Sequence, residues 1–210
     1  MGRLLLVRHG ETSWNSLGRY QGHTDVPLSD TGRAQAARLR DRLAGQRIDL
    51  VLASDLSRAA ETARLLVGDS DLQIEYRSDL REIAYGQWEG RTHAEVLASH
   101  PEHLKQWGEN PWAYFPPDGE SFSAFSDRIR AFLDDVVLPR REANILVVAH
   151  GGPVRVMLCH LLGMEPNPWR LWIEPASLSI VDLNPASTVL GLLNETCHLT
   201  EPDAAGEGTR

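Results

Sequence analysis

The 210-residue sequence predicts an α/β fold, a three-layer α/β/α sandwich with a mostly parallel central sheet. Short apolar runs bounded by turn or polar residues alternate with longer patterns of helical period, which is the order typical of a doubly wound sheet. One stretch, residues 90–117, departs from this alternation and carries aromatic side chains among prolines and charges. We expect this stretch to be a small helical and aromatic insertion over one end of the sheet.

Four apolar runs are predicted to be buried parallel strands. They are residues 3–7, 50–53, 145–149 and 178–183. Each is short and almost continuously apolar, as expected for a strand that is buried on both faces. A sheet buried on both faces needs helices on both sides, and these runs therefore predict the sandwich.

The first two helices are predicted from their start and stop signals. Ser29 and Asp30 open the first helix, whose leucines and alanines share one face. Ser54 and Asp55 are expected to cap the second helix, which stops at Gly68. Each helix begins shortly after a strand or a loop, as a crossover connection requires.

The third and fourth helices follow the same logic. A stripe of phenylalanines with Ile129 and Val136 predicts a helix over about residues 121–138, which Pro139 ends. Gly152-Pro153 opens the fourth, because proline is tolerated in the first helical turn. We expect one domain over residues 1–200.

Composition limits the function classes. The chain has 21 Lys and Arg against 29 Asp and Glu, a formal charge of −8, which argues against nucleic acid or an anionic membrane as partner. Its two cysteines, Cys159 and Cys197, have no CxxC spacing, so neither a disulfide framework nor a thiolate metal site is indicated. No apolar run is long enough for a signal peptide or a spanning helix, and we expect a cytoplasmic protein. Residues 201–210 are small, polar and aperiodic, and we expect a disordered tail.

Two predicted strands end in a His-Gly dipeptide, which begins at His9 after the first strand and at His150 after the third. Because the carboxyl ends of parallel strands meet at one edge, both imidazoles should lie there. Arg8 precedes His9, and Arg58 lies in the first turn of the helix that follows the second strand. Either dipeptide alone is more often a plain turn from strand to loop. Together with two guanidinium groups, which match phosphate oxygens, they indicate a phosphate pocket.

A set of motifs follows in fixed order from about residue 3 to about residue 199. The first is Leu6-Val7-Arg8-His9-Gly10-Glu11-Thr12-Ser13-Trp14-Asn15, and others occupy residues 21–22, 25–28, 54–59, 80–82, 86–90, 119–121 and 148–152. This ordered set resembles the histidine phosphatase superfamily, the phosphoglycerate-mutase-like enzymes, in its small phosphatase branch. The resemblance implies a phosphoryl-transfer enzyme whose insertion at residues 90–117 covers the active site.

Residue by residue, the resemblance implies that His9 is the nucleophile and that Glu82 is the general acid. It implies that Arg8, Arg58 and His150 bind the phosphoryl oxygens. The substrate-binding positions that it adds are Asn15, Gln21, Gly22 and Gly151, although a polar loop explains Gln21 and Gly22 almost as well. It implies no cofactor and no metal.

The chemistry of phosphoryl transfer agrees with these roles. The reaction needs an in-line nucleophile, charge stabilisation on the equatorial oxygens and a proton for the leaving alkoxide. The two arginines should keep His9 neutral, because neighbouring cations disfavour the imidazolium form. Glu82 needs a partly apolar setting to act as an acid near neutral pH, and Tyr85 and Trp88 could supply it.

The same motifs favour a phosphatase over a mutase. The mutase branch typically has asparagine after its second His-Gly, where this chain has Gly152. The insertion contributes only Arg91 and Lys105 among many acidic residues, which disfavours a ligand with a second strongly anionic group. We expect a hydrolase of a small phosphorylated metabolite, and a phosphoglycerate-mutase-type isomerase is the alternative.

Two alternatives come from other classes. A catalytically silent phosphate- or partner-binding module would keep the fold without the activity, but all five catalytic-type positions are present here. A metallohydrolase could use His9, His150 and Glu82 as ligands, although two neighbouring arginines would repel a dication. The remaining histidines show no ligand spacing and are expected to be packed or solvated: His23, His93, His100, His103, His160 and His198. The leaving group and the oligomeric state, with a homodimer as one option, stay open.

Overall fold

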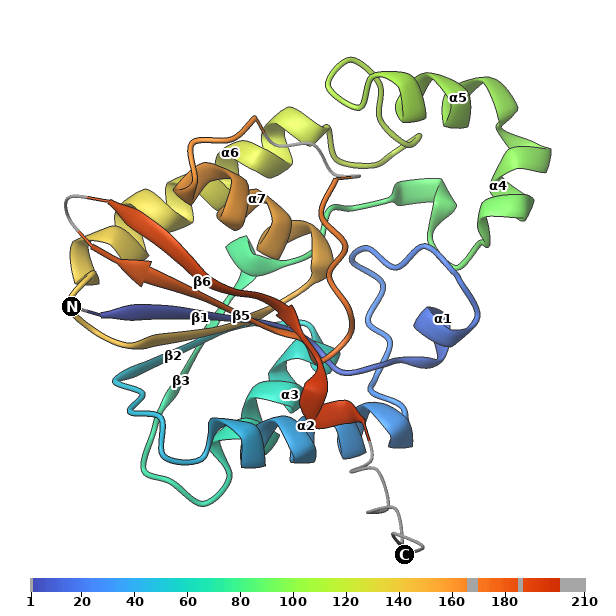
Figure 1. The fold of residues 1–210 in the computed structure, drawn as a ribbon. Helices are drawn as coiled ribbons and strands as arrows, with labels where there is room; N and C mark the ends of the chain where they lie inside the picture. The colour runs from blue at the N-terminus through green and yellow to red at the C-terminus, as the bar shows by residue number, and fades with distance from the viewer. Residues whose placement is uncertain (1, 166–169, 185–186, 201–210) are drawn as a thin grey trace, which may run out of the picture.

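The computed structural model describes residues 2–165, 170–184 and 187–200 and contains one six-stranded sheet in the order β3-β2-β4-β1-β5-β6 (Figure 1). The strands are β1 (Arg3–Arg8), β2 (Leu50–Ser54), β3 (Ile74–Arg77), β4 (Ile145–Ala149), β5 (Leu178–Leu183) and β6 (Thr188–Glu195). The longer helices are α2 (Asp30–Leu43), α3 (Ser57–Val67), α4 (His93–Ser99), α5 (Pro101–Glu109), α6 (Phe122–Phe132) and α7 (Gly151–Leu161), and α1 is the short Ser13–Ser16.

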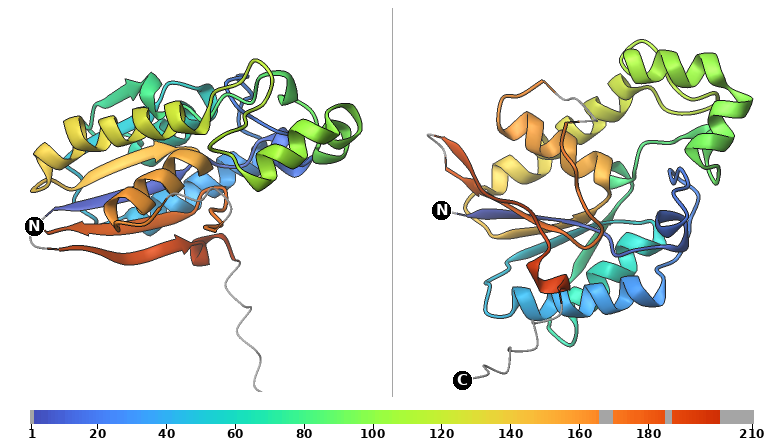
Figure 2. Two further views of the ribbon diagram at one scale, coloured as in Figure 1. Left: turned by 90° about the horizontal axis from the view of Figure 1, so that it is seen from above. Right: turned by 45° about the vertical axis from the view of Figure 1, so that its right-hand side comes forward.

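Helices cover both faces of the sheet, with α2 and α3 on one side and α6 and α7 on the other (Figures 1 and 2). Successive residues of β1 face opposite layers, as the period of a strand requires. Leu4 and Leu6 belong to the core beneath α6 and α7, whereas Leu5 and Val7 belong to the core beneath α2 and α3. The predicted sandwich is confirmed.

One strand runs against the prediction. β1, β2, β3 and β4 pair in parallel, but β5 pairs antiparallel with both β1 and β6. The expectation that residues 178–183 form a parallel strand was therefore wrong. The segment before β5 returns to the carboxyl edge of the parallel strands, where the Ala176 amide donates to the carbonyl oxygens of Arg8 and His9. An apolar run indicates burial but carries no information about direction.

Two strands were not predicted at all. β3 has only four residues and none of them is buried, so it lacks a continuous apolar run. β6 is an edge strand that alternates between half-buried and exposed positions. Both strands depend on pairing with a neighbour more than on their own composition.

The helix signals gave mixed results. Ser29 caps α2 as predicted, with its side chain accepting from the Gly32 amide. The predicted Ser54-Asp55 cap of α3 was wrong, because α3 begins at Ser57 after Leu56 without a side-chain cap. Ser54 Oγ instead contacts His150, and Asp55 pairs with Arg81.

The third predicted helix does not keep α-helical geometry along its whole length. It begins after Ser121 as α6 and continues as the π-helical segment Leu133–Val137 and the short 3-10 turn Leu138–Arg140. Pro139 was expected to end the helix, but it lies inside this turn, which continues one residue further to Arg140. α7 opens at Gly151, close to the predicted Gly152-Pro153 start.

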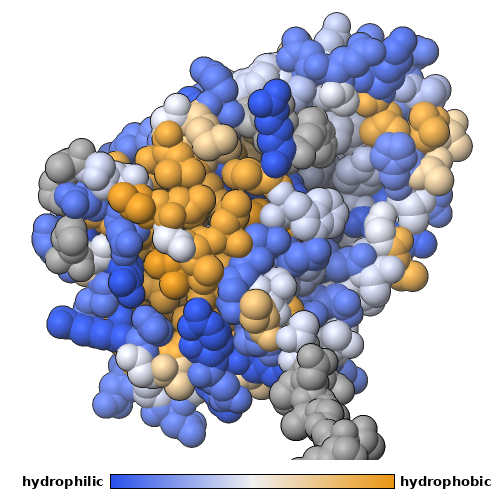
Figure 3. Space-filling model, viewed as in Figure 1, coloured by the Kyte–Doolittle hydropathy of each residue, from blue (hydrophilic) through white to orange (hydrophobic). Residues whose placement is uncertain are grey.

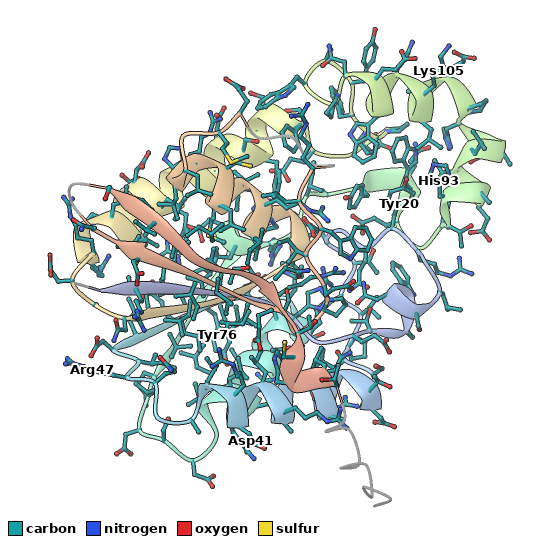
Figure 4. The ribbon with its side chains drawn as sticks, viewed as in Figure 1. Tyr20, Asp41, Arg47, Tyr76, His93 and Lys105 are labelled. Atoms are coloured by element: carbon teal, nitrogen blue, oxygen red, sulfur yellow. The ribbon has the colours of Figure 1, made fainter. Side chains whose placement is uncertain are left out.

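The segment after β3 leaves the sandwich and forms α4 and α5, which project beyond the carboxyl edge of the sheet (Figures 1 and 2). An aromatic cluster joins these helices to the body. Trp88 and Trp107 stack edge to face at 5.4 Å, and Tyr20 and Tyr85 pack against them. Figure 4 shows Tyr20 between the body and α4, and Lys105 on the outside of α5.

The face of the molecule drawn in Figure 3 carries a large apolar area. Figure 3 shows it over the edge strand β6 and its surroundings, and the exposed side chains Val189 and Leu193 belong to this strand. Within the described residues, no helix is long and apolar enough to cross a membrane. The predicted disordered tail at residues 201–210 lies outside the described residues.

Candidate active site

His9 lies immediately after β1 at the carboxyl edge of the sheet, and its side chain is only 3 % exposed. Its main-chain amide donates to the Ala149 carbonyl at 2.9 Å, which joins the ends of β1 and β4. Its Nδ1 lies 2.7 Å from the Gly10 carbonyl oxygen. Since a carbonyl can only accept, Nδ1 carries the hydrogen, and Nε2 is left with its lone pair. A nitrogen in this state is a nucleophile.

His150 follows β4 and lies beside His9, with ring centroids 5.0 Å apart. Arg58 Nε donates to His150 Nδ1 at 3.2 Å. His150 Nε2 therefore carries the hydrogen and donates to Ser54 Oγ at 2.9 Å. The three strand ends of β1, β2 and β4 thus meet at one point, as the two His-Gly dipeptides and Arg58 predict.

Both imidazoles are held neutral. Burial lowers the pKa of His9 well below 6.5, and the positive charges of Arg58 and Arg8 lower it further. Burial and Arg58 lower the pKa of His150 in the same way. Burial also lowers the pKa of Arg58 to about 10, which leaves its guanidinium charged at neutral pH. The charge requirement stated for His9 from the sequence is met.

Arg58 of α3 is fully buried and forms hydrogen bonds to several residues of the site. Its Nη1 donates to the Thr24 carbonyl at 3.0 Å and its Nη2 to the Gly22 carbonyl at 2.7 Å. Position 22 has no room for a side chain, because a Cβ there would lie 2.1 Å from Glu89 Oε1. Gly22 therefore serves the site by letting this loop approach Glu89 closely and by accepting from Arg58.

Gln21 links Arg58 to Thr12 and, through Thr12, to Asn15 at the pocket. In the amide orientation that satisfies its partners, its oxygen accepts from Arg58 Nε at 2.8 Å and its nitrogen donates to Thr12 Oγ1 at 2.6 Å. Thr12 Oγ1 donates to Asn15 Oδ1 at 3.0 Å, and the Thr12 amide donates to the same oxygen. This chain of hydrogen bonds fixes Asn15 and leaves its NH₂ group for the pocket.

Arg8 lies at the pocket itself. Its Nη1 donates to the Ile173 carbonyl at 2.6 Å. Its Nε is buried and has no hydrogen-bond partner among the described residues. Gly151, the first residue of α7, lies close to this guanidinium, since a Cβ there would be 3.7 Å from Arg8 Nε. A buried guanidinium donor without an acceptor is suited to an anionic ligand.

Glu82 faces the N-terminus of α7 across the pocket. The Ile83 amide donates to its Oε1 at 3.0 Å and the Gly152 amide to its Oε2 at 3.1 Å. Its carbonyl oxygen accepts from Arg128 Nη2 at 2.9 Å and lies 2.9 Å from His23 Nε2. Both the main chain and the side chain of Glu82 are therefore held in place.

The predicted residues divide into two groups around one pocket. Arg8, Asn15, Gln21, Glu82 and Gly151 line it. The second group is buried at this edge of the sheet and does not line the pocket; it consists of His9, Gly22, Arg58 and His150. All of them come from the expected edge of the sheet.

Four further residues line the pocket: Arg19, Tyr20, Tyr85 and Arg155. Sequence reasoning assigned no binding role to any of them. Arg155 could have been found, because it lies one helical turn after Gly151 and so shares its face. Arg19 and Tyr20 carry no such signal, since they reach the pocket only through the loop after α1. Arg91 and Lys105 of the insertion do not line the pocket.

The sequence profile of the histidine phosphatase superfamily (branch 1) matches residues 4–196. The chain belongs to this superfamily. The match covers every element from β1 to the end of β6, and the fold and the suspected resemblance are both confirmed.

Several relatives within the histidine phosphatase superfamily carry phosphatase names, and others carry phosphoglycerate mutase names. Phosphoserine phosphatase 1 of Hydrogenobacter thermophilus is 35 % identical over 96 % of this chain and 96 % of its own length. The adenosylcobalamin/alpha-ribazole phosphatase of Escherichia coli is 37 % identical over 91 % of this chain and 95 % of its own. A solved structure of a putative alpha-ribazole-5'-P phosphatase from Escherichia coli K-12 superposes with a TM-score of 0.87 at 36 % identity, covering 93 % of this chain and 97 % of that one.

The described residues offer no group of three or more His, Cys, Asp or Glu side chains arranged to hold a metal ion. In the metallohydrolase alternative His150 would be a ligand, but both its ring nitrogens are engaged, by Arg58 and by Ser54. Arg8 and Arg58 add positive charge beside His9. The two guanidinium groups make this part of the site electropositive.

Proposed function

We propose that this histidine phosphatase hydrolyses a small phosphorylated metabolite through a phosphohistidine at His9. One observation carries the proposal: a buried, neutral imidazole presents an unprotonated Nε2 at the strand edge where Arg8 and Arg58 gather. Attack needs such a lone pair, and the guanidinium groups can stabilise charge on the phosphoryl oxygens. The family and the phosphatase names of its relatives support the same reaction.

In the first step, His9 Nε2 attacks phosphorus in line with the ester oxygen. The N–P bond forms, the P–O bond breaks, and the leaving oxygen takes a proton from the Glu82 carboxyl group. Arg8, His150 and the first turn of α7 are placed to stabilise the transferring group. The hydrogen of His9 stays on Nδ1 and continues to be donated to the Gly10 carbonyl, which preserves the orientation of the ring.

In the second step, water takes the place of the alcohol. The Glu82 carboxylate accepts a proton from the attacking water, the new P–O bond forms, and the N–P bond breaks. Inorganic phosphate leaves, His9 is neutral again, and Glu82 is protonated for the next cycle. The sum is one ester and one water converted to one alcohol and one phosphate.

The substrate pocket fits a small polar leaving group. Beyond Glu82 it is lined by Arg19, Tyr20, Tyr85 and Arg155. The Arg155 Nε donates to the Leu171 carbonyl at 2.6 Å, and among the described residues no acceptor is found for its terminal nitrogens. Hydroxyl, amide or carboxylate oxygens on the leaving group could accept from these side chains.

The test is a screen of phosphomonoesters with the purified protein, with and without exhaustive chelation. Phosphoserine and alpha-ribazole phosphate are suitable probes, since relatives are named for them. We expect release of phosphate, no isomerised monoester, and no loss of activity on chelation. Isomer formation would support the mutase alternative, and activity that only zinc or magnesium restores would support the metallohydrolase.

We also infer a cytoplasmic homodimer. Cys159 is buried, Cys197 is exposed and no disulfide joins them, which suits a reducing compartment. The edge strand β6 exposes Val189 and Leu193, and such an edge is suited to association with a second copy. Light scattering coupled to gel filtration tests the dimer, and a monomeric mass would refute it.

A further inference from the structure

Gly152 and Glu82 are in direct contact, and the contact involves the main chain of Gly152 and the side chain of Glu82. The Gly152 amide donates to Glu82 Oε2 at 3.1 Å. A Cβ at position 152 would lie 2.1 Å from Glu82 Oε1 and 3.1 Å from its Cδ. Real Cβ atoms never approach an oxygen so closely, and hence the carboxylate occupies the space that a side chain at position 152 would need.

Little space for this Cβ can be gained on its other side, toward Phe125. The same Cβ would lie 2.9 Å from Cζ of Phe125, which is 1 % exposed in the main core. The Arg128 guanidinium stacks over this ring at 4.8 Å and is itself tied to Glu120 by a salt bridge at 2.8 Å. The packed Phe125 ring can therefore yield only slightly, and the flexible end of Glu82 takes the larger displacement.

We propose that Gly152 is a positioning residue that holds the Glu82 carboxylate at the leaving group, both by donating its amide and by lacking a side chain. The inference rests on the proposed function, because it assigns Gly152 a part in the proton transfer of Glu82. A side chain at position 152 displaces the carboxylate from its amide.

The backbone itself does not require glycine at this position. Gly152 lies in the first turn of α7 and does not have a positive φ. Alanine is a better helix former than glycine, so Gly152→Ala should leave the helix intact. Glu82 would lose its place above the amide, and a displacement of about 1 Å in a reacting group can cost ~10²-fold in rate.

The experiment compares Gly152→Ala, Glu82→Gln and the double variant with two substrates. An alkyl phosphate needs the acid, whereas p-nitrophenyl phosphate expels a stable phenolate. We expect Gly152→Ala to slow phosphoenzyme formation from the alkyl phosphate by ~10²-fold and to leave phosphoenzyme formation from p-nitrophenyl phosphate within about twofold of wild type. The double variant should equal Glu82→Gln, because Gly152 acts only through that carboxylate.

Gly108→Ala is the matched control, since Gly108 also lies in a helix and a Cβ there meets nothing within 4 Å. It should leave both rates unchanged. Equal slowing of both substrates in Gly152→Ala, or a further loss on top of Glu82→Gln, would overturn the inference. If wild type forms no phosphoenzyme from either substrate, the proposed function itself fails.

A second measurement does not alter position 152 and so does not depend on how its variant folds. In wild type the Gly152 amide proton should resonate downfield, because it is bonded to a carboxylate. In Glu82→Ala the acceptor is gone, and the signal should move upfield. An amide signal that stays in place would show that the contact does not exist in solution.

Discussion

Arg58 Nε donates to His150 Nδ1 at 3.2 Å, between two side chains that have no exposed surface. A guanidinium Nε always carries a hydrogen, so it selects the tautomer of the imidazole. His150 can then donate only through Nε2, which lies on Ser54. Arg58 therefore adds positive charge at this strand edge and also sets the donor direction of the second histidine.

Arg58→Lys should impair the enzyme although the charge is kept. Lysine cannot reproduce donors to Gly22, Thr24 and His150 at once, because its ammonium is a compact point charge. Loss of one charge-assisted hydrogen bond costs about 1.5–3 kcal/mol, and we expect kcat to fall by ~10–10²-fold with a smaller change in KM. Steady-state kinetics measure both.

Arg64→Lys on the exposed side of the same helix is the control and should behave like wild type. Wild-type kinetics in Arg58→Lys would instead place Arg58 outside the phosphoryl site.

His9 should become phosphorylated during turnover. Brief exposure to ³²P-labelled substrate followed by denaturation should leave a phosphoryl group that is labile to acid and stable to alkali. His9→Ala should lose the label and the turnover while keeping the fold, because the imidazole faces the strand edge and lies outside the apolar cores.

The exposed His93, labelled in Figure 4, provides the comparison, and His93→Ala should keep both label and turnover. Label recovered on serine or aspartate would refute the phosphohistidine.

Glu82→Gln should separate the two proton transfers by leaving group. With an alkyl phosphate, formation of the phosphoenzyme should slow by the ~10²–10⁴-fold typical of general acid catalysis. With p-nitrophenyl phosphate, the first step should be nearly unchanged, while hydrolysis of the phosphohistidine still lacks its base. Stopped-flow absorbance should show a burst of nitrophenolate close to the enzyme concentration, followed by a slow steady state.

The control variant is Glu89→Gln, because Glu89 accepts hydrogen bonds from the His23 and Tyr85 amides but does not line the pocket. It should affect both substrates alike. If Glu82→Gln also slows both substrates equally and gives no burst, Glu82 is not the acid.

Stability should fall below about pH 6.5. Burial first, and then Arg58, hold the folded-state pKa of His9 and of His150 well below 6.5, the value of an unperturbed imidazole. Below that pH the unfolded chain binds protons that the folded chain does not, so the free energy of unfolding decreases as the pH falls. Each histidine contributes up to about 1.4 kcal/mol per pH unit until its folded-state pKa is reached.

Urea denaturation at two pH values on either side of 6.5 measures this loss. His9→Ala removes one of the two groups and should show a shallower pH dependence. An equally steep loss in that variant would mean that His9 takes up a proton in the folded protein.

The strand ends were the part of the site that the sequence could predict. His9, His150 and Arg58 each follow directly from a strand or open a helix, so their position depends on local signals and on the rule that parallel strands share an edge. Arg19 and Tyr20 could not be found in that way. They reach the pocket through a loop that α4, α5 and the aromatic cluster hold in place, and such packing is not visible in residue spacing.

The same limit explains the errors in the fold. The apolar run of β5 indicates burial, but only the path of the preceding segment, fixed by the Ala176 amide on Arg8 and His9, decides the direction of the strand. Ser54 and Asp55 look like a helix cap because their side chains can accept from a helix N-terminus. In the folded protein Ser54 instead contacts His150, and Asp55 pairs with Arg81.

The reversal of β5 has a practical consequence for how the protein is handled. Because β5 runs antiparallel to both β1 and β6, β6 ends on the same side of the sheet as β1. Beyond β6, Thr196 and Thr200 line a surface hollow that shares Arg8 and Asn15 with the candidate pocket. Gly2 lies at the opposite side, where β1 begins. A fluorophore or surface tether attached just before Gly2 therefore starts at the opposite side of the sheet from this hollow, whereas one attached at Thr200 starts at the hollow itself.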